Sequence, residues 1–236
     1  MIDNKAFLDK NNYGFNDLVY IMKLLREKNG CPWDAEQTHE SIRNNFIEEV
    51  YEAIEAIDLK NSDHLKEELG DVLLQVVFHS QIAQDENAFT IEDVADGICK
   101  KLILRHPHVF SNVKVKDSTE VLDNWDKIKR IEKSQNTDVK AMEDVSKSLP
   151  SLMRAQKLNK KAIKYGYLKP DLKHSLNDLY KSIDLLKKEE SVPSEELLGS
   201  ILMSVAAISF LSDNDAEAAL YKACDNFIEA IEDKQS

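Results

Sequence analysis

Apolar residues recur at helical spacing over most of the chain, and polar runs interrupt them. Positions three and four apart share one face of an α-helix, so each recurrence predicts an amphipathic helix with one buried face. A capping box at Thr90 and Asp93 marks one helix start. The helices predicted in the first half span residues 15–28, 41–59, 65–84, 90–105 and 116–133.

A second set of helices is predicted for residues 151–232. Both sets have the same order: a helix, a polar break, a Leu-Gly step and a long apolar helix, with Gly199 at the place of Gly70. This similarity indicates an internal duplication. The expected domains are a first lobe at residues 1–137, a linker at 138–150 and a second lobe at 151–236.

Composition supports an all-α fold. Six glycines and five prolines in 236 residues leave few signals for strands and tight turns, whereas helix formers are abundant. With 42% hydrophobic residues, the chain can form one sizeable core or two small ones. We therefore expect two tandem helical lobes.

The formal net charge of −12 limits the partners. Nucleic-acid polymers are held by basic surfaces, so the charge argues against such a partner. Cys31, Cys99 and Cys224 are widely separated, which favours reduced thiols. The N-terminus lacks the pattern of a secretory signal, and no apolar run approaches membrane-spanning length. The expectation is a soluble, cytoplasmic protein with no membrane partner.

Acidic residues cluster on the segment 41–59. Its apolar face is expected to contain Ile47, Val50, Tyr51 and Ile54. Three acids are expected to lie away from that face, which alone is typical of a solvated helix surface. These acids are Glu48, Glu49 and Glu52.

Two further acids, Glu68 and Asp71, have a different setting. At about 100° per residue they share a stripe with Gln75, Phe78 and Ile82, which is otherwise a core-facing stripe. Buried carboxylates need a compensating partner, because an unpaired buried charge is costly. A divalent cation is such a partner, and carboxylate oxygens favour magnesium or manganese.

Two antiparallel helices would place the two acidic groups around a common point, with Glu49 and Glu52 opposite Glu68 and Asp71. A di-iron helical bundle is the competing metal hypothesis. Such bundles use two Glu-x-x-His pairs, whereas this spacing occurs only between Glu36 and His39.

The acidic pattern, Glu48-Glu49-x-x-Glu52 followed by Glu68-x-x-Asp71, resembles the signature of the all-α nucleoside triphosphate pyrophosphohydrolases, and of the MazG family in particular. Further segments resemble MazG over roughly residues 15–167. They are CPWD at 31–34 with EQT at 36–38, RHPHVF at 105–110, and SLP at 148–150 with MRAQ at 153–156.

The resemblance implies magnesium-dependent cleavage of a nucleoside triphosphate to a monophosphate and pyrophosphate, with manganese as a substitute metal. It assigns the metal to Glu49, Glu52, Glu68 and Asp71. It also implies a catalytic group in which Glu48 orients or deprotonates the attacking water. That group contains Glu48, Glu49 and Glu52.

Substrate contacts are expected elsewhere in the chain. Lys101 and Arg105 lie four apart, which favours a forked grip on phosphate, although a solvated basic helix end has the same spacing. Trp125 and Lys129 resemble the family segment that closes over the nucleotide, with Trp125 stacking on the base or packing in the core. Trp33 lines the base pocket or staples a helix turn.

The resemblance also implies a homodimer whose helices complete the bundle. Matching the two halves on the Leu-Gly step puts Leu197 and Ser200 at the places of Glu68 and Asp71, so the second lobe is expected to be catalytically silent. Two alternatives stay open. One is a non-catalytic dimerisation or regulatory module, and the other is the same fold acting on dUTP, dCTP or a phosphoribosyl nucleotide.

Overall fold

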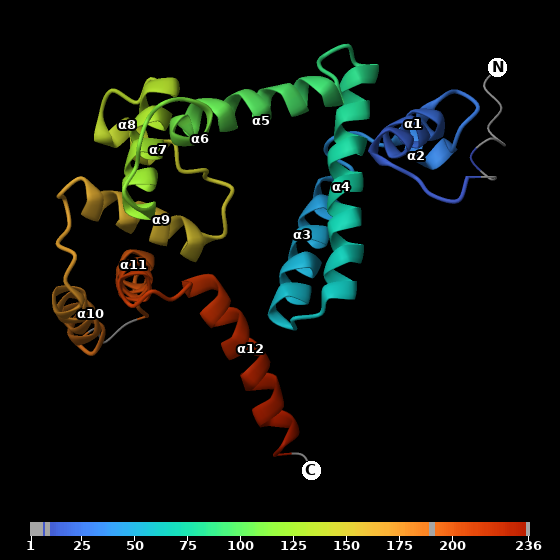
Figure 1. Ribbon diagram of the computed structural model, residues 1–236. Helices are drawn as coiled ribbons and strands as arrows, with labels where there is room; N and C mark the ends of the chain where they lie inside the picture. Colours follow the sequence, from blue (N-terminus) through green and yellow to red (C-terminus); the bar gives the residue numbers. More distant parts are fainter. Residues whose placement is uncertain (1–6, 8–9, 189–191, 235–236) are drawn as a thin grey trace. The chain divides into compact units, whose positions relative to one another are not determined.

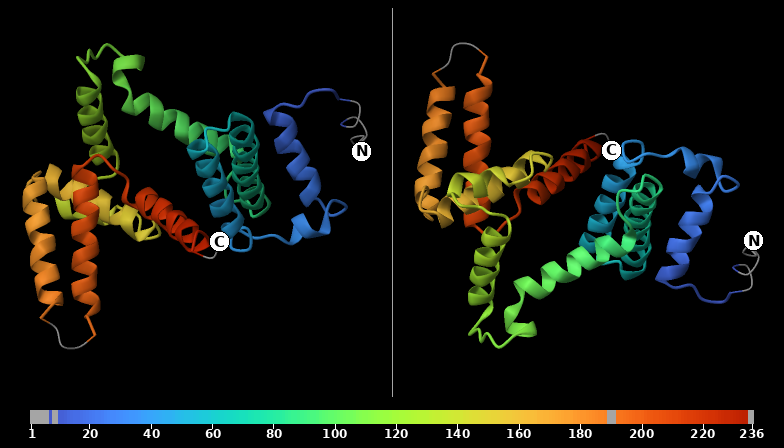
Figure 2. Two further views of the ribbon diagram at one scale, coloured as in Figure 1. Left: turned by 90° about the horizontal axis from the view of Figure 1, so that it is seen from below. Right: turned by 90° about the horizontal axis from the view of Figure 1, so that it is seen from above.

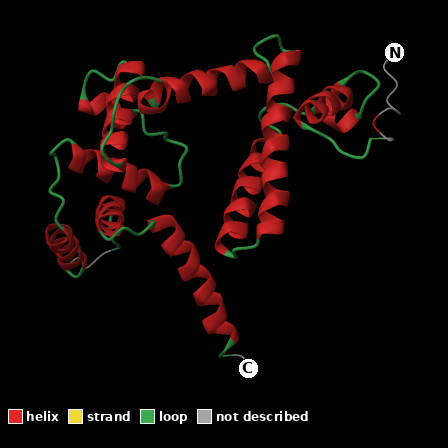
Figure 3. Cartoon of the chain, in the orientation of Figure 1, coloured by secondary structure: helices red, strands yellow, loops and turns green. Residues whose placement is uncertain are grey.

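The computed structural model describes residues 7, 10–188 and 192–234. All regular secondary structure in these residues is helical (Figures 1 and 3), which confirms the expected all-α fold. The helices are α1 (Phe15–Arg26), α2 (Pro32–Glu36), α3 (Arg43–Asp58), α4 (Ser62–Asp85), α5 (Ile91–Arg105), α6 (Pro107–Phe110), α7 (Ser118–Glu132), α8 (Asp138–Glu143), α9 (Ser151–Lys164), α10 (Leu172–Leu186), α11 (Glu195–Leu211) and α12 (Ala216–Glu232).

The chain divides into two compact units, Met1–Lys116 and Asp117–Ser236. The sequence predicted the boundary further along the chain, in a linker at residues 138–150. In the structure this segment contains the short helix α8. Helix α7 therefore belongs to the second compact unit, although its sequence was assigned to the first lobe. The division into a catalytic and a silent lobe stays a prediction.

The first unit is organised around helix α4. Helices α3 and α4 form a hairpin, and α1 packs against α4 (Figure 1). The Asn61 side chain accepts a hydrogen bond from the backbone N–H of His64 and so caps the start of α4. The core joins α1 and the turn before α3 to the second half of α4 and the start of α5. Its buried members are Met22, Ile42, Val77, Phe78, Ile82 and Ile91.

Helix α3 packs through a face that the sequence did not predict. Its buried residues are Ala53 and Ala56, which turn toward α4. The expected apolar face is instead exposed, with 50% of Ile47, 39% of Val50 and 47% of Ile54 accessible. The prediction that this apolar face packs within the chain was therefore wrong. Small residues at the inner face allow the two helix backbones to approach closely, and the larger side chains point outward.

The second unit contains a similar hairpin. Helices α10 and α11 lie side by side, and α9 packs against α11 (Figure 2). Helix α12 contacts α9 and α11. The hairpin order of α10 and α11 matches that of α3 and α4, which agrees with the expected duplication.

Two structural findings concern the cysteines and membrane spans. Cys31, Cys99 and Cys224 are free thiols. Among the described helices, none is by itself long and apolar enough to cross a membrane. The pair α11 and α12 passes that test together, but the two helices are bent by 105° relative to each other.

Phe78 provides a test of the α4 core. Its ring is 4% exposed and lies under the Arg26 guanidinium, 5.6 Å from the ring centroid. Replacing Phe78 by alanine should lower the free energy of unfolding by about 3–5 kcal/mol, because it removes buried contacts and leaves a cavity. Urea unfolding of the whole chain, followed by circular dichroism, measures the change. Leu69→Ala, at a 54% exposed site of the same helix, is the control and should change stability much less. Equal losses in the two variants would contradict this core assignment.

Candidate metal centre

Three carboxylates from the two helices of the first hairpin converge. Glu49 of α3 and Glu68 and Asp71 of α4 each have one oxygen within 4.8 Å of the other two. Glu68 is buried, and Glu49 and Asp71 are half-buried. Glu49 precedes Ala53 by one helix turn and lies on the same inner face of α3. Because α3 packs through its alanines, Glu49 does not lie on the solvated surface that the helix pattern taken alone would indicate.

Crowding and burial raise the pKa of two of these acids. Partial burial is the main cause for Glu49, and the charges of Asp71, Glu52 and Glu68 add to it. Burial is again the first cause for Glu68, followed by the charge of Glu52, whereas His64 opposes the shift. Glu52 is exposed and lies outside the close trio, but its charge acts on both residues. The cluster thus disfavours full ionisation in the absence of a cation.

The basic partner of this cluster is a residue that sequence reasoning missed. His64 Nε2 lies 2.9 Å from Glu68 Oε1, one helix turn earlier on α4. Among the described residues, no lysine or arginine forms an ion pair with Glu49, Glu68 or Asp71. The spacing of four residues between His64 and Glu68 was the available signal. A single imidazole cannot balance the charge of this cluster.

The residues present fit a hard divalent cation. Oxygen ligands of one magnesium ion lie at most about 4.2 Å apart, twice the usual metal–oxygen distance, so the trio needs only small side-chain adjustments. Gln75 adds a second observation. It follows Asp71 by one turn, is 6% exposed, and its Oε1 is buried without a hydrogen-bond partner. An orphaned buried acceptor beside an acidic cluster is typical of a place where a metal-bound water would donate.

The histidine of the competing di-iron hypothesis lies elsewhere. His39 stacks on His79 of α4, with 5.1 Å between ring centroids and 2.8 Å between the two Nδ1 atoms. Burial, and then the neighbouring His39, lower the pKa of His79. His39 is therefore engaged with another imidazole and is absent from the carboxylate trio. This arrangement disfavours the Glu36 and His39 pair as iron ligands.

The remaining candidate residues of the first unit lie outside the trio. Glu48 is exposed on α3, and Trp33 is 58% exposed on α2. Lys101 is exposed and Arg105 is 8% exposed, both in the second half of α5. Helix α5 begins beyond the C-terminal end of α4 (Figure 1). Glu68 and Asp71 lie in the first half of α4 (Ser62–Asp85). Asp71 is 14 residues from Asp85, or about 21 Å along α4. One chain thus does not bring this basic pair to its own acids.

Trp125 and Lys129 lie on α7, in the second compact unit. The Lys129 Nζ is 5.1 Å from the centroid of the Trp125 ring, which is a cation–π contact. Both side chains are half-buried. Their expected place at the nucleotide stays a prediction.

An all-α protein with carboxylates converging from two packed helices belongs to a class that uses divalent cations. A family model described as the MazG nucleotide pyrophosphohydrolase domain matches residues 37–110. This range includes α3, α4, α5 and the four predicted metal-binding acids, Glu49, Glu52, Glu68 and Asp71. The chain belongs to the MazG nucleotide pyrophosphohydrolase family. Trp33, Trp125 and Lys129 lie outside the matched residues.

Three relatives show how far the similarity extends. A protein of Escherichia coli K12 named nucleoside triphosphate pyrophosphohydrolase is 39% identical over 217 residues, covering 89% of this chain and 82% of the relative. A Thermotoga maritima protein named nucleoside triphosphate pyrophosphohydrolase/pyrophosphatase MazG is 42% identical over 216 residues, covering 91% and 83%. YabN of Bacillus subtilis, whose name describes it as uncharacterized, is 51% identical over 146 residues, which are 62% of this chain and 30% of that protein.

The raised pKa values predict how pH affects the metal-free protein. Folded Glu49 and Glu68 hold their protons more tightly than they do in the unfolded chain, so their contribution to stability falls as pH rises from about 4.3, the ordinary glutamate value, through their raised values. Glu68→Gln removes one such group. In EDTA, its melting temperature should therefore rise relative to that of the unsubstituted protein as pH increases through this window.

Differential scanning calorimetry at a series of pH values measures this difference. Glu55→Gln, at an exposed acid of α3, is the matched control and should follow the parent. Melting curves of Glu68→Gln that run parallel to the parent at every pH would show that burial at this site does not destabilise the charge.

Proposed function

We propose that the protein hydrolyses nucleoside triphosphates to monophosphates and pyrophosphate in a magnesium-dependent reaction. The observation that carries the proposal is the convergence of Glu49, Glu68 and Asp71 from α3 and α4. The names of the E. coli and T. maritima relatives support the reaction class. The three free thiols support a cytoplasmic location.

The chemistry follows from the charge of the substrate. A triphosphate repels an approaching water, so cations must neutralise its oxygens before the reaction proceeds. Glu49, Glu52, Glu68 and Asp71 would hold the metal, which when bound would neutralise the phosphates and stabilise the leaving pyrophosphate. Manganese has similar ligand preferences and could replace magnesium.

The chain's own groups supply the remaining steps. Glu48, one residue before a metal-binding acid, would orient the attacking water and accept its proton. The α–β anhydride bond breaks, the hydroxyl of water completes the monophosphate, and the bond's electron pair leaves with pyrophosphate. Because Gln75 presents a buried acceptor one turn beyond Asp71, it would accept a hydrogen bond from a water beside the acids.

Substrate binding needs groups beyond the acids. Lys101 and Arg105 would bind phosphate oxygens, and Trp125, Lys129 and Trp33 would contact the base and close the site. Lys101 and Arg105 do not reach the acids within one chain, so we propose that a second copy of the chain presents them. The substrate choice between common triphosphates and dUTP, dCTP or a phosphoribosyl nucleotide depends on that completed pocket.

The exposed apolar face of α3 supports the same homodimer. Ile47, Val50, Tyr51 and Ile54 form a contiguous stripe on the surface of one chain, and such stripes mark interfaces. Helix α5 also exposes large apolar residues, including Ile98 and Leu102. Packing these faces against a second copy would convert the open hairpin into a bundle.

The alternative, a non-catalytic helical module, retains the same fold and the same dimer. It predicts acids that tolerate substitution and no release of pyrophosphate. A panel of ribo- and deoxynucleoside triphosphates incubated with magnesium, with products separated by chromatography, distinguishes the two. Orthophosphate and a diphosphate as products would reject the proposed reaction.

Removing one metal-binding acid tests the site directly. Glu49→Gln and Glu68→Gln should each lower magnesium-dependent pyrophosphate release by about 100-fold or more, because they weaken the cation that stabilises transition-state charge. Calorimetric titration with magnesium should show weaker binding in parallel. Glu55→Gln on α3 is the control and should retain activity. Full activity in either site variant would exclude this assignment of ligands.

Dimerisation through α3 is tested at Ile54, which is 47% exposed in one chain. Ile54→Glu should shift the species in solution from twice the 27.0 kDa chain mass to a single chain, because a charge would be buried in an apolar interface. Light scattering coupled to size exclusion gives the mass. Glu55→Lys changes a neighbouring exposed residue and should leave the dimer intact. A wild-type protein of single-chain mass would reject the dimer itself.

A further inference from the structure

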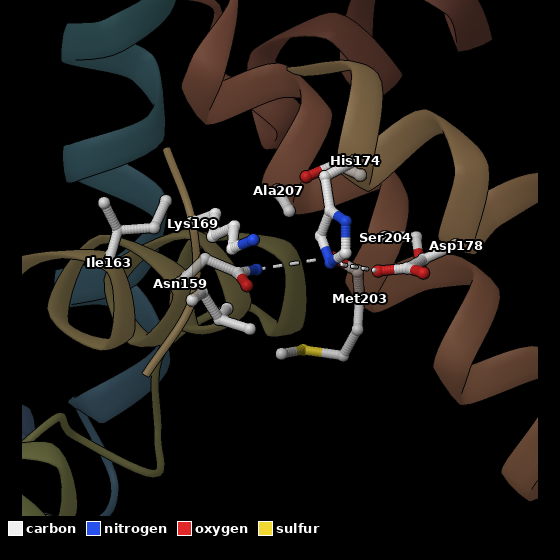
Figure 4. A pocket seen from close by; sticks show the side chains of 10 residues that line it. Asn159, Ile163, Lys169, His174, Asp178, Met203, Ser204 and Ala207 are labelled. Atoms are coloured by element: carbon white, nitrogen blue, oxygen red, sulfur yellow. Dashed lines mark hydrogen bonds and ion pairs between the residues drawn. The ribbon is translucent and has the colours of Figure 1, made fainter. Parts of the chain in front are cut away.

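The second compact unit contains a cavity of about 220 Å³ between α9, α10 and α11. The ammonium of Lys169, the amide of Asn159 and the imidazole of His174 lie around it (Figure 4). Its apolar lining includes Ile163 and Met203. The volume is several times the roughly 30 Å³ that a water molecule occupies in the liquid, so the cavity can accept a ring-sized group.

A difference between the two hairpins accounts for this space. When α11 is matched to α4 on the Leu-Gly step, Ala207 takes the place of Phe78. In the first unit the Phe78 ring is 4% exposed and fills the region between α4 and α1. In the second unit Ala207 lines the cavity that faces α9. The second hairpin thus lacks both the acids of the first and the aromatic side chain that fills its core.

The cavity combines an apolar wall with fixed polar groups. Asn159 is 3% exposed, and its Nδ2 donates a hydrogen bond to the Met203 carbonyl at 3.3 Å, which fixes the amide at the cavity. His174 Nε2 lies 3.4 Å from Asp178 Oδ2, which orients the imidazole. Few polar groups set against an apolar lining are typical of sites for small organic ligands.

The surrounding charge favours an anionic ligand. Residues 151–173 contain seven lysines and arginines but one acid, Asp171, in a chain of net charge −12. Lys164 of this segment pairs with Asp126 at 2.8 Å, away from the cavity lining. Lys169 lies on the lining itself, and the carboxylate of the lining, Asp178, is paired with Lys181 at 2.9 Å. A basic segment in an acidic protein concentrates positive potential beside this cavity.

We propose that this cavity binds a small organic phosphate of the nucleoside monophosphate class. The phosphate lies against Lys169 and His174, and the base lies against Ile163 and Met203. The charge and shape of the cavity support an organic phosphate by themselves. Its identity as a nucleotide rests on the proposed function, whose product is a monophosphate, so the second lobe would sense that product.

Calorimetric titration of the full chain with the four 5′-ribonucleoside monophosphates in EDTA tests the proposal, because binding then needs neither metal nor turnover. At least one monophosphate should bind, and orthophosphate should bind much more weakly. Lys169→Glu and Ala207→Phe should each raise the Kd by at least about tenfold. Lys157→Glu is the matched control: it lies on α9, within the basic segment, but outside the cavity lining. It should change the Kd much less.

Several results would overturn the proposal. They are no binding of any monophosphate, equal binding of orthophosphate, equal weakening by Lys157→Glu, and binding only of single-stranded nucleic acid. Lys169 is exposed, so its variant folds even where Ala207→Phe overpacks the helices. Glu68→Gln should keep the monophosphate affinity. In the unsubstituted protein, monophosphate binding without any pyrophosphate release would reject the proposed function alone, and pyrophosphate release without monophosphate binding would reject this site alone.

Discussion

Mutual repulsion among carboxylates at the α3–α4 interface is the constraint on which the rest of the first unit depends. Glu49, Glu68 and Asp71 are held close together and partly out of water, and burial, followed by the neighbouring carboxylate charges, raises the pKa of Glu49 and of Glu68. Left alone, they would push the helices apart. The second half of α4 opposes this through its buried contacts with α1 and the start of α5. One long helix thus has an acidic first half, which could hold a cation, and an apolar second half, which keeps the acids together.

The sequence predicted α4 well because the apolar periodicity and the position of the acids indicate the same face of the helix. Phe78 and Ile82 are both buried, and Glu68 lies on the same stripe, as the periodicity indicated. On α3 the same reasoning failed. Periodicity finds the larger apolar face, but it cannot tell whether that face packs within the chain or against a second copy. Ala53 and Ala56 carry a weak hydrophobic signal, although they make the contact that positions Glu49.

Other features required coordinates. His64 becomes recognisable as a partner of Glu68 only when the imidazole and carboxylate are seen 2.9 Å apart. The unpaired Oε1 of Gln75 and the cavity beside Ala207 result from packing, and the residue types alone do not predict them. The family motif, by contrast, correctly indicated the family because the spacing of its acids is fixed by helix geometry. The proposed contacts of Lys101 and Trp125 with substrate depend on how separate helices assemble, which the sequence of one chain does not encode in its spacing.

The alanines of α3 have a consequence of a different kind. They carry no chemistry, but they fix the separation of two helix axes, and that separation fixes how far apart the oxygens of opposite helices lie. In the proposed site, residues that never touch the ion would thus select its ionic radius. In a hairpin of this design, metal preference can change through hydrocarbon side chains while every ligand stays the same. A comparison of such proteins by their acidic motif alone would find identical sites where the ions they accept differ.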